Sequence, residues 1–596
     1  MSVLDRIERL RNVMEQQKID CYIIPTDDYH HSEYVGDYFK FREYITGFTG
    51  SAGTAVFTKD KAGLWTDGRY FIQAEAQLKG SGITLYKSGE SDVPTIEEFL
   101  KSELKEGDVL GFDGRTVTYA QGKRYCHIAD ENGASLKYSL DFAQNIWKER
   151  PEMSMEPVFS LEDEYTGEKI GSKLERIREI MKENGCNAHV LSSLDDIAWL
   201  LNIRGNDIAY CPLVLSYAIV YNNSVELFAD IRKFSDDIIN LLAENQVKIY
   251  PYEDIYRKVS EMTSEDKLLL DSSIMNYSLY QAISKETVIV DKQNPEILMK
   301  SVKNETQAEN LRKAHLKDAV AHTKFMYWLK KNIGRVEITE LSASARLEGL
   351  RAEQEHFLGP SFGPISAYGE HGAIVHYSAD EKSNVPLKEG KLFMTDTGGH
   401  YLEGSTDITR TVALGEVGNL EKEHFTLVAR AMLRLANTVF LYGCSGANLD
   451  CIAREIFWKE GLNFNHGTGH GVGYLLNIHE GPINFRWKEG ERPAPALEEN
   501  MVITDEPGIY IEGSHGIRLE NELLVRKTVK NEYGQFMNFE ILTYVPIDLD
   551  AILPEKMSTE EKEMLNHYHK QVYEKVSPYL SEEERIWLKE YTRAVK

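Results

Sequence analysis

The feature that most constrains the fold of this chain is an order of local patterns that occurs twice. Near the N-terminus, an amphipathic helical pattern precedes a short apolar run, CYIIPTDD, which ends in an acidic turn, and β-rich runs bounded by glycines follow. One module later the same order recurs around AHVLSSLDD, LVLSYAIVY and VELFADIRKF. Identical residues are sparse, so the repeat is weak. It predicts two similar α/β domains, joined near ERPEMSMEPVFS.

The chain has 596 residues, which is more than one hydrophobic core usually covers, so two to four domains are expected. We place the first α/β domain at residues 1–160, its repeat at 161–298 and a third module at 299–596. Within the third module, a helical C-terminal extension is expected from about residue 550.

The helices of this chain can be predicted from apolar faces, caps and the absence of helix breakers. Between Glu305 and Asn332 there is neither Gly nor Pro, which predicts one long helix, and residues 336–351 and Leu420–Tyr442 are also expected to be helical. The apolar faces of the two repeated helices are Leu4, Ile7, Leu10 and Met14, and Leu174, Ile177, Ile180 and Met181. The tail has two capping-box patterns, Ser558-x-x-Glu561 and Ser581-x-x-Glu584.

Composition and charge exclude several classes of partner. The net charge is −26, from 94 acidic and 68 basic residues, and no basic stripe compensates for it. We therefore expect neither nucleic acid nor a membrane as a partner. The six cysteines lack CxxC spacing and predict buried or free thiols. With no long apolar run and no signal-peptide pattern, a cytoplasmic protein is expected.

Four acidic residues and one histidine of the third module are candidates for chemistry. Asp396 and Asp407 stand eleven residues apart in LFMTDTGGHYLEGSTDITRTVAL, where glycines predict a hairpin or a bend that brings the carboxylates together. Glu506 and Glu520 stand in apolar, strand-like runs, where a carboxylate needs a partner such as a cation. His470 stands in NFNHGTGHGVG, whose glycines let the backbone approach whatever the imidazoles hold.

This set of side chains could hold two divalent cations. Four carboxylates balance the charge of two such ions, and a carboxylate can bridge two metals where an imidazole cannot. Oxygen-rich ligation favours Mn²⁺, Co²⁺ or Zn²⁺ in a hydrolytic site. Each side chain also has a structural explanation, because an Asp in a glycine turn is commonly a turn residue and Glu520 could pair with Arg518 on a solvated face. The residues alone leave both interpretations open.

Five motifs, in this order, resemble those of the pita-bread metallopeptidases, a group that includes methionine aminopeptidase, prolidase and aminopeptidase P. They are MTDTGGHY, STDITRT, HGTGHGVG, TDEPGIY and RLENELLV. The resemblance implies an α/β (α+β) fold with two creatinase-like domains followed by a pita-bread catalytic domain. It also implies that Asp396 binds one metal ion, that His470 and Glu506 bind the other, and that Asp407 and Glu520 bridge them. Mn²⁺ is the first choice of metal.

Four further residues match the proline-specific branch of this group. His376 in AIVHY and His479 in LNIHEGP resemble substrate-side histidines that hold the tetrahedral intermediate and move a proton, and His466 resembles a substrate-side group as well. Arg69 of WTDGRYF matches an arginine assigned to peptide binding. A salt bridge from Arg69 to Asp67 or Asp230 is its structural alternative.

The three-module length resembles the long, cytosolic Xaa-Pro aminopeptidases. This resemblance implies a homodimeric enzyme that hydrolyses the N-terminal bond of peptides with proline at the second position. The attacking group would be a hydroxide held between two metal ions, with Glu506 as the proton acceptor. The nearest alternative is a prolidase, which cleaves Xaa-Pro dipeptides and usually has one N-terminal domain. A non-catalytic pita-bread module that binds peptides is the other alternative, and the presence of all five candidate ligands argues against it.

Overall fold

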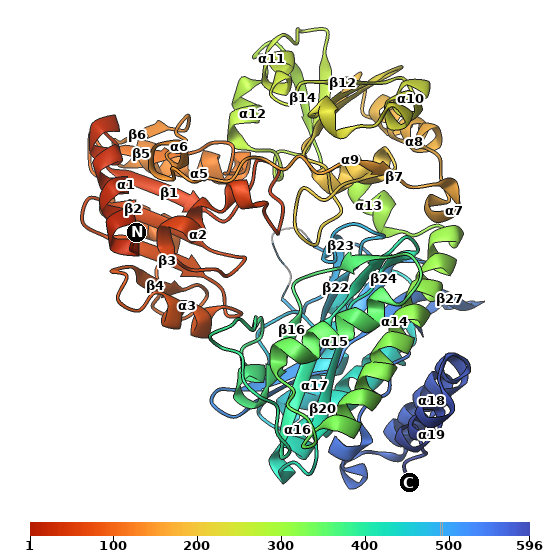
Figure 1. Ribbon diagram of the computed structural model, residues 1–596. Coiled ribbons are helices and arrows are strands. Elements are labelled where there is room, and N and C mark those ends of the chain that lie inside the picture. Colours follow the sequence, from red (N-terminus) through yellow and green to blue (C-terminus); the bar gives the residue numbers. More distant parts are fainter. Residues whose placement is uncertain (489, 491–492) are drawn as a thin grey trace. The chain divides into compact units, whose positions relative to one another are not determined.

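The computed structural model describes residues 1–488, 490 and 493–596, which form two compact units (Figure 1). The first unit comprises Met1–Leu161 and Glu168–Glu296, and the second comprises Glu162–Gly167 and Ile297–Lys596. Both predicted α/β repeats belong to the first unit, so the domain boundaries after residues 160 and 298 stay predictions. Among the described residues, no helix is long and apolar enough to cross a membrane.

The first unit contains two six-stranded mixed sheets, with the strand orders β4-β3-β2-β1-β5-β6 and β12-β11-β10-β8-β13-β14. In the first sheet β1 pairs antiparallel with β2 and parallel with β5, and β8 pairs in the same two ways with β10 and β13 in the second sheet. The two sheets therefore share one topology, which confirms that the weak sequence repeat reflects two related α/β folds.

The strands of these sheets are short and mostly buried. They are β1 (Cys21–Pro25), β2 (Thr54–Thr58), β3 (Ala62–Thr66), β4 (Thr84–Lys87), β5 (Val109–Phe112), β6 (Ser135–Lys137), β8 (Ala188–Leu191), β10 (Tyr217–Tyr221), β11 (Val225–Phe228), β12 (Val247–Tyr250), β13 (Lys267–Leu270) and β14 (Val288–Asp291), while β7 (Phe159–Ser160) and β9 (Ile203–Arg204) pair separately.

The helices of the first unit accompany the strands in the same order in both repeats. They are α1 (Val3–Gln17), α2 (Phe41–Thr46), α3 (Phe71–Gln77), α4 (Ile96–Glu103), α5 (Tyr119–Glu131), α6 (Ala143–Ile146), α8 (Ile170–Glu183), α9 (Leu194–Leu200), α10 (Asp236–Glu244), α11 (Asp254–Ser260) and α12 (Tyr277–Ala282), and α13 (Pro295–Ser301) leads into the second unit. Along α1, Ile7, Leu10 and Met14 are buried as predicted, whereas Leu4 is 57% exposed because it lies in the first turn.

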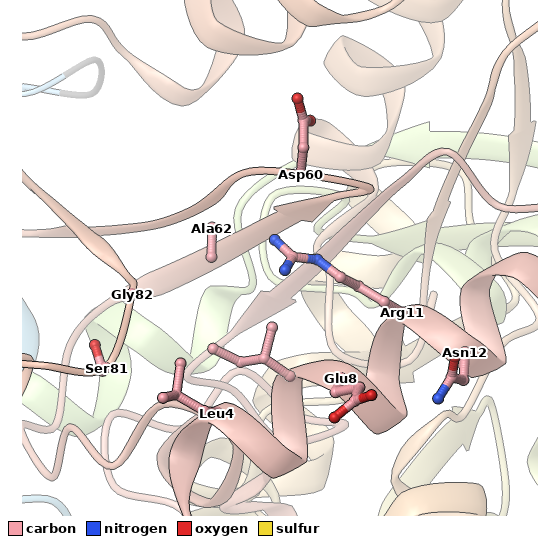
Figure 2. Close-up of a pocket in the computed structure, with 9 residues that line it drawn as sticks. Leu4, Glu8, Arg11, Asn12, Asp60, Ala62, Ser81 and Gly82 are labelled. Atoms are coloured by element: carbon pink, nitrogen blue, oxygen red, sulfur yellow. The ribbon is translucent and has the colours of Figure 1, made fainter.

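A pocket of the first unit lies between α1 and the β2–β3 turn (Figure 2). Its cavity volume is about 210 Å³, and Leu4, Arg11 and Asp60 are among the side chains that line it. Arg11 donates to the backbone oxygens of Thr58 and Lys61, each over 3.1 Å. Arg11 thus already holds α1 against the sheet.

The second unit is built on a six-stranded sheet of order β21-β28-β27-β24-β22-β23, with two three-stranded sheets, β16-β17-β20 and β15-β18-β19. The strands are β15 (Phe357–Pro360), β16 (Ile365–Tyr368), β17 (Lys391–Thr397), β18 (Gly399–Tyr401), β19 (Gly404–Ser405), β20 (Ile408–Leu414), β21 (Phe440–Leu441), β22 (Gly469–Gly471), β23 (Glu480–Phe485), β24 (Val502–Asp505), β27 (Asn521–Asn531) and β28 (Gly534–Ile541), and β25 (Gly508–Ile511) pairs with β26 (His515–Arg518).

Helices pack against these sheets and close one large apolar core. They are α7 (Asp163–Thr166), α14 (Glu305–Asn332), α15 (Glu340–Ala352), α16 (Asn419–Ala436), α17 (Gly446–Lys459), α18 (Thr559–Val576) and α19 (Glu582–Tyr591). In Figure 1, α14 and α15 run side by side over the strands, and α18 and α19 lie against α14. Phe325 of α14, Met432 of α16, Leu523 of β27 and Leu565 of α18 all belong to the same buried cluster.

The predicted helices of this unit are present, but two differ in their limits, and the one predicted at residues 336–351 begins at Glu340 instead. The helix α14 begins at Glu305, capped by Asn304, and ends at Asn332. Both tail helices begin at capping boxes, formed by Ser558 and Ser581. The helix predicted at Leu420–Tyr442 ends at Ala436 instead, because the following residues form β21, which pairs with β28.

Candidate metal centre

An antiparallel strand pair brings the first two acidic residues together. Asp396 lies near the end of β17, and Asp407 lies immediately before β20. The two strands pair directly, with Asp396 opposite Thr409, and β18 and β19 form the connection between them. The predicted hairpin is therefore confirmed, and it places both aspartates at the same end of the strand pair.

The other three candidates come from the large sheet. His470 lies on β22, Glu506 directly follows β24 and Glu520 directly precedes β27. Because β24 pairs with both β22 and β27, these positions are adjacent in space. The Glu506 N–H donates to the Thr468 carbonyl over 2.8 Å, and the Glu520 N–H donates to the Thr409 carbonyl over 3.1 Å. The second bond joins the large sheet to the β17–β20 hairpin.

Three of the five side chains form one tight cluster. Ligand atoms of Asp407, His470 and Glu520 all lie within 4.8 Å of one another, and within the described part of the chain no other trio of histidine, cysteine or acidic side chains does so. Nε2 of His470 is 3.6 Å from Oδ2 of Asp407 and 3.7 Å from Oε1 of Glu506. Glu506 therefore borders the cluster on the side of His470.

The cluster contains carboxylate oxygens that fit a bound cation. One oxygen each of Asp396, Asp407 and Glu520 is buried without a hydrogen-bond partner among the described residues. A buried carboxylate oxygen without a donor is costly unless a cation approaches it. Carboxylate oxygens with one imidazole nitrogen are donors that suit Mn²⁺ and Zn²⁺. The residues present thus fit the metal ions that the sequence predicts.

Burial and mutual repulsion raise the pKa of three of these acids. Burial first, and then the charges of Asp396 and Glu506, raise the pKa of Asp407 well above its ordinary value. Burial and the charge of Asp407 do the same to the pKa of Glu520. The pKa of Glu506 rises to about 7, chiefly through burial, although Arg518 opposes the rise. A cation reverses this repulsion, so its binding displaces protons.

Arg518, on β26, is the partner of Asp396. Its Nε donates to Oδ2 of Asp396 over 3.1 Å, and its Nη2 forms an ion pair with the same oxygen. Its Nη1 donates to the hydroxyl of Tyr510 over 2.6 Å. Glu520 is buried and accepts a hydrogen bond from the hydroxyl of Thr409 over 2.8 Å. The alternative in which Glu520 pairs with Arg518 on a solvated face is therefore wrong.

The two histidines of the glycine-rich run have different surroundings. Nε2 of His466 lies 2.8 Å from the hydroxyl of Tyr510, and Nδ1 lies 2.7 Å from the Gly467 carbonyl. Burial, and secondly the charge of Arg518, lowers the pKa of His466 to about 3, so its ring is neutral. His466 is thus linked through Tyr510 and Arg518 to Asp396, whereas His470 belongs to the cluster.

Two glycines of this run allow neighbouring strands to approach β22. A Cβ on Gly469 would lie 1.9 Å from the carbonyl oxygen of Thr504, and one on Gly471 would lie 2.3 Å from that of Glu480. No side chain fits at these distances. We expected the glycines to make room for what the imidazoles hold. At these two positions that expectation is wrong, because the glycines make room for the backbones of β24 and β23.

Of the predicted substrate-side histidines, His479 lies against the cluster and His376 lies next to a residue that contacts Arg518. The His479 ring stands nearly perpendicular to the His470 ring, with centroids 4.3 Å apart. His376 follows a 3₁₀ turn at Gly369–Ala373, and the carbonyl of its neighbour Val375 accepts from Nη2 of Arg518 over 3.3 Å. Both histidines are half-buried.

Arg69 lies in the first unit, at the end of the β3 segment. Its Nε donates to Oδ1 of Asp67 over 2.9 Å, and its Nη2 donates to Oδ2 over 2.8 Å. The salt bridge to Asp67 that was the structural alternative is therefore present. Asp230 pairs instead with Arg232 in the second repeat.

Glu522, an acidic residue that was not predicted from the sequence, holds the backbone of Asp407. Oε1 of Glu522 accepts the Asp407 N–H over 2.6 Å, and Oε2 lies 3.1 Å from Nε2 of the buried His315 on α14. The sequence holds a weak signal for this role, since Glu522 lies two residues after Glu520 and shares its face of a strand. His315 gives no such signal, because its contact depends on where α14 packs.

Four segments of the chain match known protein families. Residues 6–137 and 149–307 match creatinase/prolidase N-terminal domains, residues 309–527 match metallopeptidase family M24, and residues 535–595 match the C-terminal region of peptidase M24. Over 97% of its length the chain is 36% identical to Xaa-Pro aminopeptidase 1 of Dictyostelium discoideum, and the match covers 94% of that protein. The chain belongs to the metallopeptidase family M24, among the Xaa-Pro aminopeptidases.

Two further relatives of this family extend over the whole chain. Aminopeptidase P1 of Arabidopsis thaliana is 34% identical, and the match covers 99% of each protein. The crystal structure of X-prolyl aminopeptidase from Caenorhabditis elegans, described as a cytosolic enzyme with a di-nuclear active site, aligns with a TM-score of 0.95 at 33% identity and covers 100% of both chains. The expected fold, two creatinase-like domains followed by a pita-bread domain, is thereby confirmed.

Proposed function

We propose that this chain is a metal-dependent aminopeptidase that hydrolyses the N-terminal Xaa-Pro bond of peptides. The observation that carries the proposal is the buried cluster of Asp407, His470 and Glu520, whose ligand atoms lie within 4.8 Å of one another. It occurs in a chain whose full-length relatives are named Xaa-Pro aminopeptidases. A prolidase is less well supported, because those relatives match this chain over both N-terminal repeats and the M24 segment.

The proposed ligand set contains all five candidates and holds two divalent cations. His470 and Glu506 would hold one ion, Asp396 the other, and Asp407 and Glu520 would be shared by both. The distances from His470 to Asp407 and Glu506, 3.6 and 3.7 Å, agree with a shared ion. Mn²⁺ is the proposed metal, with Zn²⁺ or Co²⁺ as alternatives, because the donors are mainly carboxylate oxygens.

When bound, two such ions acidify a water molecule and polarise the carbonyl of the scissile bond. Glu506, which lies beside His470, would accept the proton of that water. His376 and His479 hold the carbonyl oxygen and carry a proton to the departing proline nitrogen, which is too basic to leave unprotonated. Arg518 orients Asp396 and, through Tyr510, the neutral ring of His466.

Arg69 is proposed to contact the peptide in addition to its ion pair with Asp67. We expect Arg69→Met to raise KM several-fold with the bound metal unchanged, because the cluster belongs to the second unit. Arg232→Met is the matched control, since Arg232 forms the same ion pair with Asp230 in the second repeat. If KM is unchanged in Arg69→Met, Arg69 does not contact the peptide and serves only to pair with Asp67.

The cellular location, the oligomeric state and the domain limits of the enzyme are also proposals. We propose that the enzyme is cytoplasmic, in line with the cytosolic description of the worm relative, and that it is a homodimer, as the family resemblance implies. The proposed domains are residues 1–160, 161–298 and 299–596, with the helical extension beginning at about residue 550. Sedimentation equilibrium measures the dimer directly, and a monomer at micromolar concentration contradicts it.

Three substrates distinguish the proposed activity from its alternatives. Metal-free protein is reconstituted with Mn²⁺ and assayed on Xaa-Pro-Yaa, Xaa-Pro and Xaa-Ala-Yaa peptides. Cleavage of the first alone is expected. Cleavage of the dipeptide alone identifies a prolidase, and binding of Xaa-Pro-Yaa without cleavage identifies a peptide-binding module.

A further inference from the structure

Arg410 lies behind the metal centre and is fully buried. It stands on β20, three residues after Asp407. Its Nη1 donates to the carbonyl of Glu520 over 2.6 Å and to the carbonyl of Thr409 over 2.8 Å. The Glu520 N–H in turn donates to the same Thr409 carbonyl over 3.1 Å. Arg410 therefore fixes the peptide from which the Glu520 side chain extends.

Nε of Arg410 has no hydrogen-bond partner in the described part of the chain. Apart from Nη1, the orientation of the guanidinium therefore depends on Nη2. Nη2 shares its two hydrogens among three acceptors: the hydroxyl of Tyr568 and Oδ1 of Asn521, both over 2.7 Å, and the carbonyl of Val545 over 2.9 Å. The Tyr568 hydroxyl donates its own hydrogen to that same Val545 carbonyl over 2.6 Å.

Tyr568 is the contribution of the C-terminal region to this network. It is 1% exposed and lies on α18, a helix separate from the strands that carry the cluster. Its hydroxyl accepts from Arg410 while donating to Val545, so it ties the guanidinium to the Val545 carbonyl and limits its rotation. A phenylalanine of the same shape removes that constraint and no apolar contact.

The carboxylate of Glu520 makes few contacts of its own that could position it. Oε2 accepts from the Thr409 hydroxyl over 2.8 Å, and Oε1 has no hydrogen-bond partner among the described residues. Its direction toward the cluster is thus set by its peptide and by Thr409. A shift of the Glu520 peptide therefore moves its carboxylate relative to Asp407 and His470.

We propose that Tyr568 is a positioning residue of the metal centre, which holds Arg410 and through it the peptide of Glu520. The proposal rests on the proposed function, since it assigns Glu520 to metal binding. It gives the C-terminal region matched at residues 535–595 a role in the metal site as well as in the core. Removing the supporting groups of a metal ligand typically weakens metal binding about 10- to 100-fold.

The test compares Tyr568→Phe with Tyr573→Phe in the full-length protein. Tyr573 lies five residues further along α18, is half-buried and packs on the same core, so its substitution is the matched control. Mn²⁺ is titrated into metal-free protein by calorimetry, and Co²⁺ binding is followed by visible absorption, which reports the ligand geometry. We expect about 10-fold weaker Mn²⁺ binding and an altered Co²⁺ spectrum for Tyr568→Phe only.

Arg410→Lys is the second variant, because it keeps the charge and loses the planar fork, and it is expected to weaken Mn²⁺ binding at least as much. Metal affinity within about twofold of the unmodified protein in Tyr568→Phe overturns the proposal, even where the unfolding temperature falls. That result leaves the proposed function intact. An unmodified protein that takes up none of Mn²⁺, Co²⁺ and Zn²⁺ contradicts the proposed function itself, so the two failures can be told apart.

Discussion

Arg518 makes the most specific polar contacts around the candidate metal centre. Its guanidinium holds Asp396 through two nitrogens and Tyr510 through the third. Lysine has one compact charge and no planar fork, so it cannot reproduce this arrangement. We expect Arg518→Lys to lower kcat/KM on an Xaa-Pro-Yaa peptide by about 10- to 100-fold and to reduce the bound metal.

The control for this substitution is Arg526→Lys, whose partly exposed side chain lies outside the cluster. Peptide kinetics and elemental analysis of the purified variants provide the measurement. If both variants retain unmodified kinetics and metal content, Arg518 does not orient Asp396.

At the scale of the element, the short strand β22 depends on glycine. A methyl group at Gly469 would lie 1.9 Å from the Thr504 carbonyl oxygen, so β22 and β24 must separate in Gly469→Ala. We expect the free energy of unfolding to fall by about 2 kcal/mol or more and His470 to be displaced. Gly349→Ala on α15 is the control, because a Cβ there meets no atom and alanine favours a helix.

Unfolding of both variants in denaturant measures this difference. Equal midpoints for Gly469→Ala and the unmodified protein would show that β22 tolerates a side chain there, and the packing argument would fail.

The helix α18 should make the fold sensitive to acid. His569 is buried and its Nε2 accepts the Ile547 N–H over 3.1 Å, so burial lowers its pKa from 6.5 to about 3. Between these values the unfolded chain binds a proton that the folded chain does not. The free energy of unfolding therefore falls as the pH drops from 6.5 towards 3, by about 2 kcal/mol at pH 5.

His569→Gln removes this titration and keeps an acceptor for Ile547. Its unfolding temperature should fall less between pH 7 and pH 5 than that of the unmodified protein, whereas His567→Gln, on the exposed side of α18, should behave like the unmodified protein. Parallel pH dependence in all three proteins would contradict a neutral, buried His569.

At the scale of the whole molecule, local patterns predicted the elements and long-range packing decided the rest. The long helix Glu305–Asn332 and the tail helices have clear start and stop signals, and the repeated pattern led to two sheets of one topology. The pairing of Asp396 with Arg518 is different, because it joins residues 122 apart through the meeting of β17 and β26. No local pattern carries that information.

The same limit applies to the groups behind the cluster. His315 and Glu522 are placed together by α14, and Tyr568 reaches Arg410 only because α18 packs on the core of the second unit. The candidate ligands could be predicted because they stand in short motifs, each on or next to one strand. Their supports could not, because each support comes from a distant element.

The central claim is that two cations bound by this cluster carry the hydrolysis of Xaa-Pro peptides. It is tested most directly by titrating metal-free protein with Mn²⁺ while following cleavage of an Xaa-Pro-Yaa peptide, beside the Asp407→Asn variant. We predict that activity rises until two equivalents are bound and that the variant stays inactive with reduced binding, because Asp407 belongs to the cluster. Full activity in the presence of EDTA, or in Asp407→Asn, would contradict the claim.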